Sequence, residues 1–298
     1  MRDYGISADK LKSSAQGAAI NRAYAALEPD RAIRNGDSLA KLFADKSIQA
    51  SDVTDFRDQL EAMLPGAYFF QNVRTKHIDH LLAQALHDGF KQVVILGAGY
   101  DSRAYRFNAP DVRFIEVDLP ALQQDKIARL KAHLGQLPAT VSYLELDFNQ
   151  QSLANLCGCE TFQPDVATFF IWEGVSYYLS EEGVNATLSF VGKHCARGSR
   201  IVFDYMPASM IDRSVEYFGG EQSHTFMASV GEPVIFGIAD NELAQFLAAH
   251  NLKVDSDLSP DALAQAYLRT EDGSIYGRVA GYIRIAQASV LASAPPEI

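Results

Sequence analysis

Two glycines and a carboxylate follow two predicted strands near the middle of the chain. The first, the apolar run at residues 92–96 (QVVIL), leads directly into Gly97-Ala98-Gly99, and the second, residues 112–117, leads into Asp118. Glycine has no side chain, so a turn built from it lets the backbone close up against a ligand. One carboxylate can accept hydrogen bonds from both hydroxyls of a ribose. These residues therefore predict a site for a ribose-containing ligand.

The elements that must position these groups follow from the spacing. Residues 92–96 are a continuous apolar run after Gln92, which is typical of a strand buried on both faces of a sheet. A short helix is expected next, capped by Asp101 or Ser102 and ending before Pro110. Residues 112–117 form the second predicted strand. Strand, glycine turn, helix, strand and carboxylate make half of a nucleotide-binding βαβ unit.

The charges around the turn bear on the identity of the ligand. A dinucleotide-binding fingerprint would place a third glycine where this chain has Ser102. It would also bring a diphosphate beside Asp101, an unfavourable pairing unless a cation such as Arg103 or Arg106 offsets it. S-Adenosylmethionine carries the same adenosine without phosphate, and its sulfonium and ammonium groups favour nearby acids. The pattern favours this cofactor, while a tight turn that binds no ligand is also compatible with it.

Several motifs in a fixed order resemble one known family. They are Arg74-Thr75-Lys76-His77-Ile78-Asp79, Val94-Ile95-Leu96-Gly97-Ala98-Gly99-Tyr100-Asp101-Ser102-Arg103, Glu116-Val117-Asp118-Leu119-Pro120, Asp147-Phe148 and Glu173-Gly174-Val175-Ser176-Tyr177-Tyr178-Leu179. In this succession they are similar to the leucine carboxyl methyltransferase-like family of S-adenosylmethionine-dependent O-methyltransferases, which has many bacterial members. The resemblance implies S-adenosyl-L-methionine as cofactor. It also implies an α/β, Rossmann-like class I methyltransferase fold, with a seven-stranded, mostly parallel sheet, an antiparallel last strand and a helical N-terminal cap.

The same resemblance assigns roles to individual residues. It implies that Arg74 holds the carboxylate of the cofactor, a task suited to the guanidinium fork, and that Glu173 pairs with its ammonium group. Asp147 would accept a hydrogen bond from the adenine amine, and Phe148 would hold the purine face. Taken alone, Arg74 would be a solvated arginine and Asp147 a helix cap. The predicted cofactor-binding set is Arg74, Gly97, Ala98, Gly99, Asp101, Asp118, Leu119, Asp147, Phe148, Glu173 and Gly174.

An acceptor site is predicted later in the chain. Residues 206–237 show little periodicity and are interpreted as a substrate-specificity insertion, because a stretch this long without regular structure is usually functional or partly helical. His224 within it is a candidate general base, although a loop histidine is often merely exposed. Tyr178 is a second candidate catalytic residue. The residues expected to line the substrate mouth are Tyr177, Tyr178, Tyr205 and Phe226, with aromatic packing as the alternative for Tyr177 and Tyr178.

We expect a single domain over residues 1–298. Its parts would be a helical cap or lid (1–90), a cofactor-binding core (91–205), the insertion (206–237) and the C-terminal part of the sheet (238–298). Arg22, in the first predicted helix, is expected to be a structural ion-pair partner, and the proline-rich tail is expected to fray. Helices are predicted over residues 8–27, 69–86, 121–134, 180–194, 241–250 and 260–267, and further strands over 141–146, 165–172, 200–204, 252–256 and 279–288.

Composition narrows the partners and the location. The net charge of −11 and the pI near 5.1 argue against a nucleic-acid partner, because no basic stripe is present. Apolar runs are only strand-sized, which argues against a membrane span, and residues 1–20 lack the apolar core of a signal peptide. Cys157, Cys159 and Cys195 do not complete a metal site and are expected to be free thiols. We therefore expect a cytoplasmic enzyme with a small-molecule acceptor and no metal.

Other functions share parts of this pattern. An NAD(P)-dependent oxidoreductase would carry Tyr-x-x-x-Lys or an equivalent, but Tyr177 and Tyr178 are followed at that spacing by Glu181 and Glu182. A catalytically silent adenosyl-binding protein would bind the cofactor and transfer nothing. Because no residue stands out as a dedicated base, a carboxylate or acidic hydroxyl acceptor is slightly favoured. A small molecule such as a secondary metabolite is preferred to a protein C-terminal carboxylate, since the resemblance is thin outside the cofactor motifs.

Overall fold

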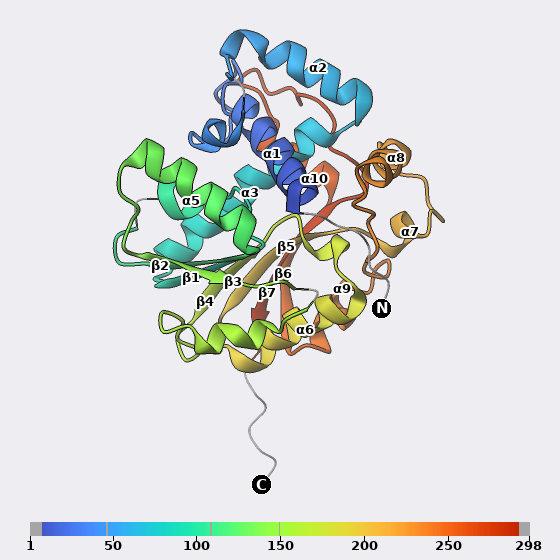
Figure 1. The fold of residues 1–298 in the computed structure, drawn as a ribbon. Coiled ribbons are helices and arrows are strands. Elements are labelled where there is room, and N and C mark those ends of the chain that lie inside the picture. Colours follow the sequence, from blue (N-terminus) through green and yellow to red (C-terminus); the bar gives the residue numbers. More distant parts are fainter. Residues whose placement is uncertain (1–7, 46, 108, 149, 292–298) are drawn as a thin grey trace.

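The computed structural model describes residues 8–291, apart from positions 46, 108 and 149, with side chains from residue 14 onward. The elements form three layers, with a sheet between two sets of helices (Figure 1). The tail at residues 292–298, for which the sequence predicts fraying, lies outside the described residues.

The middle layer is a sheet of seven strands: β1 (Gln92–Leu96), β2 (Arg113–Asp118), β3 (Val141–Glu145), β4 (Thr168–Trp172), β5 (Arg200–Tyr205), β6 (Leu252–Leu258) and β7 (Arg284–Val290). Their order is β3-β2-β1-β4-β5-β7-β6. Strands β1 to β5 pair in parallel, whereas β7 is antiparallel to both of its neighbours, β5 and β6. The predicted mostly parallel sheet with an antiparallel last strand is confirmed.

The last strand begins later than the sequence predicts. A strand was expected over residues 279–288, but β7 starts at Arg284. The preceding residues 279–283 are mostly apolar and buried, as strand residues would be. Their backbone groups bond outside the sheet, because the Ala280 amide donates to the Gly66 carbonyl (3.2 Å) and the Gly281 amide to the Phe218 carbonyl (2.9 Å). Apolar character alone therefore overextended the predicted strand.

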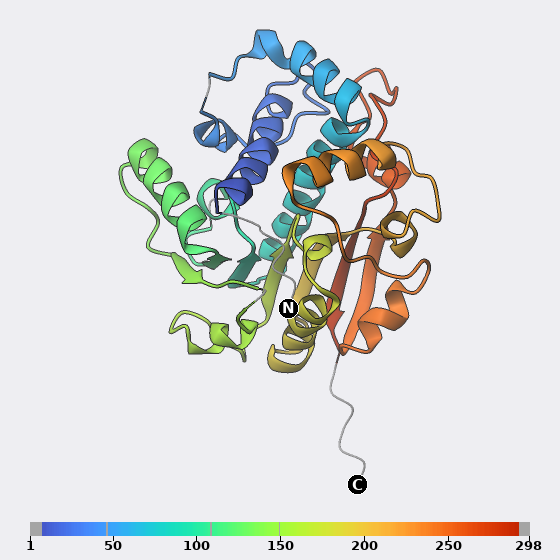
Figure 2. The same ribbon diagram turned by 45° about the vertical axis from the view of Figure 1, so that its right-hand side comes forward.

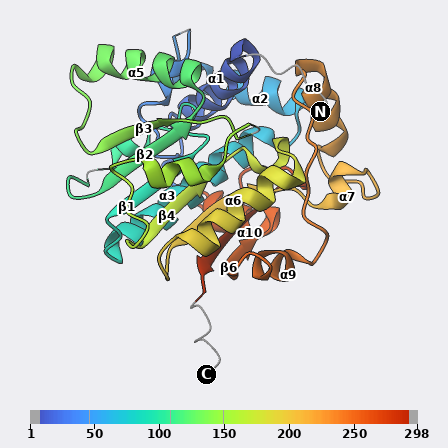
Figure 3. The ribbon, with the colours of Figure 1, turned by 60° about the horizontal axis from the view of Figure 1, so that its bottom comes forward.

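Helices cover both faces of the sheet (Figure 3). The predicted helices near residues 8–27, 69–86 and 121–134 are confirmed with small shifts at their ends. The helices and 3-10 turns are α1 (Ala8–Ala25), η1 (Ala40–Phe43), η2 (Ala50–Asp52), α2 (Val53–Met63), α3 (Ala67–His87), α4 (Arg103–Arg106), α5 (Pro120–Leu134), η3 (Leu153–Gly158), η4 (Ser176–Tyr178), α6 (Glu181–His194), α7 (Ala208–Ile211), α8 (Gly220–Val230), α9 (Leu243–Ala248) and α10 (Pro260–Tyr267).

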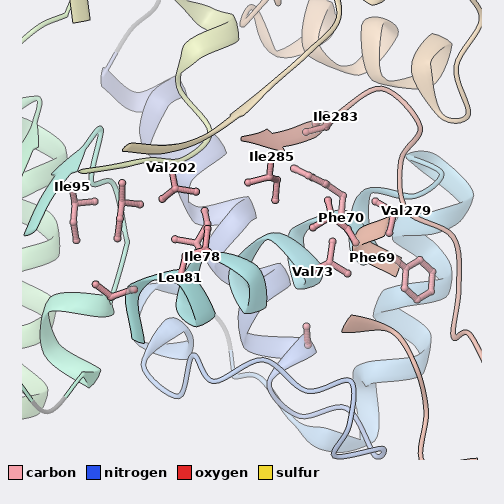
Figure 4. Packing of buried hydrophobic residues seen from close by; sticks show 14 of the residues in the cluster. Phe69, Phe70, Val73, Ile78, Leu81, Ile95, Val202, Val279, Ile283 and Ile285 are labelled. Carbon is pink, nitrogen blue, oxygen red and sulfur yellow. The ribbon is translucent and has the colours of Figure 1, made fainter. Parts of the chain in front are cut away.

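Two apolar clusters hold the layers together, one on each face of the sheet. On the first face, α3 packs against the central strands and α10 packs against α3 and the edge strand β6; Figure 4 shows Ile78 and Leu81 of α3 near Ile95 and Val202 of the sheet. On the second face, η3, α6 and α9 cover the alternate residues of the same strands. Successive side chains of a strand point to opposite faces. A residue at a strand tip therefore faces either α3 or α6.

The N-terminal helices pack beside α3 and α5, at the end of the molecule that Figure 2 shows uppermost. Arg22 of α1 anchors them, because its Nε donates to Asp37 at 2.8 Å and its Nη2 to the Tyr100 carbonyl at 2.7 Å. All three residues are buried. The predicted structural role of Arg22 is confirmed, and the bond to Tyr100 ties the first helix to the residue that follows the glycine turn.

The helices and the cysteines also bear on the sequence-based expectations. Among the helices of the described residues, none combines the length and apolar character that crossing a bilayer requires. The three cysteines are free thiols, as predicted. Burial, assisted by the nearby Cys157, raises the pKa of the Cys195 thiol to about 12.

A buried ion pair joins β2 to α5. Lys126 Nζ lies 2.7 Å from Glu116 Oε1, and both side chains are almost fully buried. The other carboxylate oxygen of Glu116 accepts a hydrogen bond from the Tyr105 hydroxyl at 3.2 Å, and Tyr143 bonds to the same tyrosine. Burial raises the pKa of Glu116 to about 7; Asp101 adds to the rise, while Lys126 opposes it.

Replacing Glu116 by Gln is expected to remove a pH-dependent part of the stability. A carboxyl group whose pKa is higher in the folded than in the unfolded chain stabilises the fold while it is protonated. That contribution is complete below pH 4.5, the unperturbed value, and is lost as the pH rises to about 7.

The free energy of unfolding, measured with urea, should thus fall for the wild type relative to Glu116→Gln between about pH 5 and pH 7.5, by on the order of 2 kcal/mol. Glu145, which is exposed on β3, provides the matched Glu→Gln control. A wild-type-to-variant difference that stays constant over this range would contradict the assignment.

Candidate functional site

The carboxyl ends of β1, β2, β3, β4 and β5 meet at one edge of the sheet, because these strands run parallel. Open α/β sheets bind their ligands at this edge. The main chain is tightly joined there: the amides of Gly97 and Ala98 donate to the Val117 carbonyl at 2.8 and 3.1 Å, and the Leu146 amide donates to the Asp118 carbonyl at 2.9 Å. The predicted cofactor residues after these strands are thus brought together on a rigid frame.

The glycine turn has left-handed backbone angles at Gly97 (φ 65°) and Gly99 (φ 42°). A Cβ atom added at Gly97 would lie 2.4 Å from Val175 Cγ2, whereas one added at Gly99 would come no nearer than 3.8 Å to Ala15. The position of the Val175 side chain therefore requires a glycine at position 97, whether or not a ligand binds. Both glycines remain partly exposed, which leaves their backbone accessible to a ligand.

The side chain of Asp118 accepts hydrogen bonds from two backbone amides, one of them in the glycine turn. One of its carboxylate oxygens accepts from the Gly99 amide, and the other accepts from the Leu119 amide at 2.6 Å. Burial raises the pKa of Asp118, although these two backbone bonds oppose the rise. The carboxylate predicted to receive the ribose is thus fixed in orientation directly beside the glycine turn, and each of its oxygens can still accept a further hydrogen bond.

The start of α4 is capped by Asp101. Its Oδ1 accepts from the Arg103 amide at 2.7 Å, while the Ser102 side chain makes no cap hydrogen bond. The Ser102 hydroxyl is instead buried and donates to Asp37 at 2.5 Å. Of the two caps that the sequence allowed, the structure selects Asp101. It also gives Ser102 a structural partner at the position where a dinucleotide fingerprint would have its third glycine.

Glu173, directly after β4, lies between two buried arginines. Arg103 Nη1 donates to its Oε2 at 2.7 Å, and Arg74 Nε lies 3.1 Å from its Oε1. Burial alone would raise the pKa of Glu173, but Arg103 and Arg74 outweigh it and lower the pKa to about 2. A carboxylate that is largely removed from water needs a cationic partner, and the structure supplies two within the protein.

Arg74 reaches the same place from α3 and is buried, so it is not the solvated arginine that its sequence position alone would suggest. Its Nη1 donates to Asp204 at 2.6 Å, and the Gly174 amide donates to the other oxygen of Asp204 at 2.7 Å. Burial would lower the pKa of Arg74, but Glu173 and Asp204 raise it instead.

From the sequence, no role was predicted for Asp204, nor for Asp79, which was named only as part of a motif. Asp79 accepts hydrogen bonds from Arg103 (2.8 Å) and from Arg106. A signal existed for it, since Asp79 lies in the same helix as Arg74 and within the same motif. The cluster has four carboxylates and three guanidinium groups: Asp79, Asp101, Glu173 and Asp204 with Arg74, Arg103 and Arg106.

Asp147 and Phe148 follow β3 and are both half-buried. The helix-cap alternative for Asp147 is wrong, because η3 is capped by Ser152, whose side chain accepts from the Ala154 amide. Asp147 instead accepts from the Gln150 side chain at 2.7 Å. Phe148 packs against the second apolar cluster. Their position beside Asp118 agrees with the predicted adenine end of the site, since β2 and β3 are neighbours.

The acceptor residues predicted on η4 differ in their surroundings. Tyr177 is buried, and its hydroxyl lies 3.3 Å from Asp204, so it lies beneath the arginine cluster as a packing residue. Tyr178 is half-buried, and its hydroxyl lies 3.5 Å from the sulfur of Met227 in α8. Burial, followed by the effect of Glu232, raises the pKa of Tyr178. A phenol with a raised pKa stays protonated at neutral pH and does not act as a base.

The insertion is partly helical and folds back over η4. The Ile235 amide, beyond α8, donates to the Tyr177 carbonyl at 2.8 Å. His224 lies on α8 rather than in a loop, and its Nε2 donates to the Met210 carbonyl at 2.8 Å, which leaves Nδ1 as the acceptor nitrogen. His224 and Met227 are three residues apart and so share a face of the helix. Phe226, which precedes Met227 in the sequence, is half-buried.

Tyr205 is not brought together with the other predicted acceptor residues. It points to the α6 face of the sheet, opposite to Asp204, and its hydroxyl donates to Asp257 while accepting from Arg284 (3.1 Å). The prediction that Tyr205 lines the substrate mouth overlooked the alternation of side chains along a strand, which places Tyr205 and Asp204 on opposite faces of the sheet.

Among the described residues there is no group of histidine, cysteine or acidic side chains that could hold a metal ion.

A family model matches more than half of this chain. The model describes leucine carboxyl methyltransferases and covers residues 15–192. That range contains every motif at the sheet edge from Arg74 to Glu173, as well as Arg22 and the C-terminal part of its helix, α1. The resemblance that the sequence motifs indicated is confirmed.

Two bacterial relatives and one solved structure agree with this match. YktD of Bacillus subtilis (strain 168) is 31% identical over 190 residues, which cover 63% of this chain and 62% of that protein. A Mycolicibacterium smegmatis protein is 30% identical over 205 residues, 66% of this chain and 64% of that protein. Both are named as S-adenosyl-L-methionine-dependent methyltransferases, an assignment that is itself inferred. The chain spans less than two thirds of the length of these relatives.

The solved structure is that of a duf574 family protein from Streptomyces avermitilis. It has a TM-score of 0.59 with this chain at 13% sequence identity and covers 92% of this chain and 97% of that one. At this identity the likeness concerns the fold alone. Together with the strand order, it confirms the predicted class I methyltransferase fold.

Replacing Gly97 by Ala is expected to destabilise the protein and to disturb the turn, because the new Cβ would overlap Val175 and the backbone angle would be strained. The expected cost is about 1–3 kcal/mol. Gly99→Ala provides the matched control, since it shares the positive φ but has room for a methyl group. Thermal unfolding should show a clearly larger loss for Gly97→Ala than for Gly99→Ala. Equal losses would show that the contact with Val175 is unimportant.

Proposed function

The chain belongs to the leucine carboxyl methyltransferase family, and on this premise we propose that it is an S-adenosylmethionine-dependent O-methyltransferase acting on a carboxylate or hydroxyl group of a small molecule. The observation that carries the proposal is the acidic edge of the sheet. Asp118 lies beside an accessible glycine turn, and Glu173 lies at the tip of β4 next to Arg74. These groups have the charges needed to bind an adenosyl ligand that bears both an ammonium and a carboxylate group.

The residues present fit the cofactor. Asp118 would accept from the ribose hydroxyls, and the backbone at Gly97, Ala98, Gly99 and Leu119 would line the nucleoside. Asp147 and Phe148 would hold the adenine. Glu173, with Gly174 beside it, would receive the ammonium group, and Arg74 would receive the carboxylate. In support, Glu173 and Arg74 already lie 3.1 Å apart, so that one α-amino acid group can reach both.

A diphosphate-bearing cofactor fits this edge less well. Asp101 caps the helix after the glycine turn, where a diphosphate would be held, and its carboxylate would repel that group. Arg103 is the nearest cation in sequence, but the three carboxylates that contact it, Asp79, Asp101 and Glu173, more than offset its single charge, so it cannot balance a dianionic diphosphate. These contacts favour a cationic adenosyl ligand over NAD(P). A silent adenosyl-binding protein would show the same contacts, and only a test of transfer distinguishes it.

The bound cofactor would supply a methyl group on an already activated sulfonium leaving group. The protein then has to align the acceptor and exclude water, and such orientation can contribute about 7–11 kcal/mol. Glu173 and Arg74 would fix the amino acid end of the cofactor, because the side chain of Arg74 is buried, that of Glu173 is only 11% exposed, and both are held by further ion pairs. The insertion over η4 would cover the acceptor side, with Tyr178 and α8 facing it. Phe226 is proposed as a further lining residue; Tyr205 is left out because it points to the other face.

The need for a base depends on the acceptor. A carboxylate is ionised at neutral pH and needs none, whereas a hydroxyl group benefits from one. His224 is the candidate base for a hydroxyl acceptor, since its Nδ1 is the acceptor nitrogen. Tyr178, whose pKa is raised, is better suited to donate a hydrogen bond to the acceptor than to remove a proton. A small acceptor, such as a secondary metabolite, remains our proposal, and the free thiols favour a cytoplasmic setting.

Replacing Glu173 by Gln is expected to weaken S-adenosylmethionine binding by about tenfold or more, because a hydrogen-bonded charge pair with the ammonium is lost. 5′-Methylthioadenosine lacks the amino acid end, and its affinity should change less than twofold or so. Calorimetry with both ligands measures this, with the exposed Glu182→Gln as control. If both ligands lose affinity equally, or neither does, the role of Glu173 is refuted.

The class of acceptor can be read from the product. Incubation of the enzyme with methyl-labelled donor and metabolite extracts should transfer label to a small molecule. A methyl ester releases labelled methanol in mild alkali, whereas a methyl ether does not. If the product is an ester, we expect His224→Gln to retain activity; if it is an ether, the variant should lose about a hundredfold or more. Label found only in protein would contradict the small-molecule proposal, and no transfer to any fraction would favour a silent binder.

A further inference from the structure

Arg103, at the ligand edge of the sheet, has several ion-pair partners but one side-chain nitrogen without a hydrogen bond among the described residues. Arg103 is 2% exposed. Its Nε donates to Asp79 at 2.8 Å, and its Nη1 donates to both Asp101 and Glu173. Its Nη2 is buried and has no hydrogen-bond partner among the residues that the structure describes. Buried donors of charged groups are normally paired, because leaving one unpaired is costly.

The neighbouring arginine shows a related feature. Arg74 Nε is also buried without a hydrogen bond within the described residues, although it lies 3.1 Å from a Glu173 oxygen in an ion pair. The two guanidinium groups approach Glu173 from different helices, α3 and α4, and bind different oxygens of it. Unused donor capacity of two arginines is therefore concentrated around one carboxylate, at the place proposed for the amino acid end of the cofactor.

We propose that Arg103 is a second cofactor-binding residue, whose Nη2 donates to the carboxylate of S-adenosylmethionine together with Arg74. This inference depends on the proposed function, because it assumes the cofactor. A carboxylate has two oxygens and accepts up to about four hydrogen bonds. Two arginines on either side of Glu173 can bind it while Glu173 binds the ammonium group. The amino acid end would then be held by two buried arginines, from α3 and α4, and by the largely buried Glu173 directly after β4.

The acidic partners of Arg103 would serve to orient its guanidinium group for the cofactor. Asp79, Asp101 and Glu173 all contact it and hold its guanidinium plane in one orientation. Arg106 provides the contrast, because it also contacts Asp79 but has no contact with Glu173, and its Nε donates to Ser102 at 2.9 Å. Arg103 and Arg106 lie on the same short helix, so one is the matched control for the other.

The test separates the carboxylate from the rest of the ligand. Arg103→Lys keeps the charge and can still reach the acids, but it loses the fork that provides Nη2. Binding is measured by calorimetry for three ligands: S-adenosylhomocysteine, its decarboxylated analogue S-adenosyl-3-thiopropylamine, and 5′-methylthioadenosine. The first has ammonium and carboxylate groups, the second only the ammonium, and the third neither. Arg106→Lys is measured in parallel, and circular dichroism checks that each variant is folded.

We expect Arg103→Lys to weaken S-adenosylhomocysteine binding by about ten- to a hundredfold and to change the other two affinities by less than about threefold. Arg106→Lys should leave all three ligands nearly unchanged. Equal losses for S-adenosylhomocysteine and its decarboxylated analogue would overturn the proposal, because Arg103 would then act only by orienting Glu173. Equal losses for all three ligands, or no loss for any, would overturn it as well. If the wild type binds none of the three, it is the proposed function that fails.

Discussion

The placement of Glu173 between Arg74 and Arg103 is the interaction on which the site depends. A carboxylate at the tip of a central strand is costly to bury, and removing one member of a buried pair leaves an uncompensated charge. Here the cost is offset from two sides, by 2.7 and 3.1 Å contacts. Since the arginines come from α3 and α4, the pair also fixes these two helices relative to β4. Positioning of the helices and of the ligand-binding charges thus has a common cause.

The pairs around this centre extend it across the molecule. Asp79 connects Arg103 to Arg106, and Ser102 connects Arg106 to Asp37, which is bound by Arg22 of the first helix. On the other side, Arg74 leads to Asp204 at the end of β5. The N-terminal helices and the fifth strand are therefore joined through a series of polar contacts. The proposed acceptor side, at α8 and η4, has fewer charged contacts among the described residues.

Much of this arrangement could be predicted from the sequence, because it depends on local patterns. The sequence pattern located the first six strands to within a few residues, and acids after those strands that run parallel had to meet at one edge of the sheet. Pairings over long separations were not predictable in this way: Arg74 and Asp204 are 130 residues apart, and only packing brings them together. Tyr205 was predicted to line the substrate mouth, although strand alternation directs its side chain to the opposite face of the sheet from Asp204. The start of the last strand was misplaced because residues 279–283 are mostly apolar and buried but do not pair in the sheet.

The central claim is that an acidic sheet edge selects a cationic adenosyl ligand and disfavours a diphosphate. Calorimetric titration of the wild-type protein with S-adenosylmethionine, S-adenosylhomocysteine and NAD tests this most directly. We predict micromolar binding of both adenosyl ligands and no measurable binding of NAD. Micromolar binding of NAD, with neither adenosyl ligand bound, would contradict the claim.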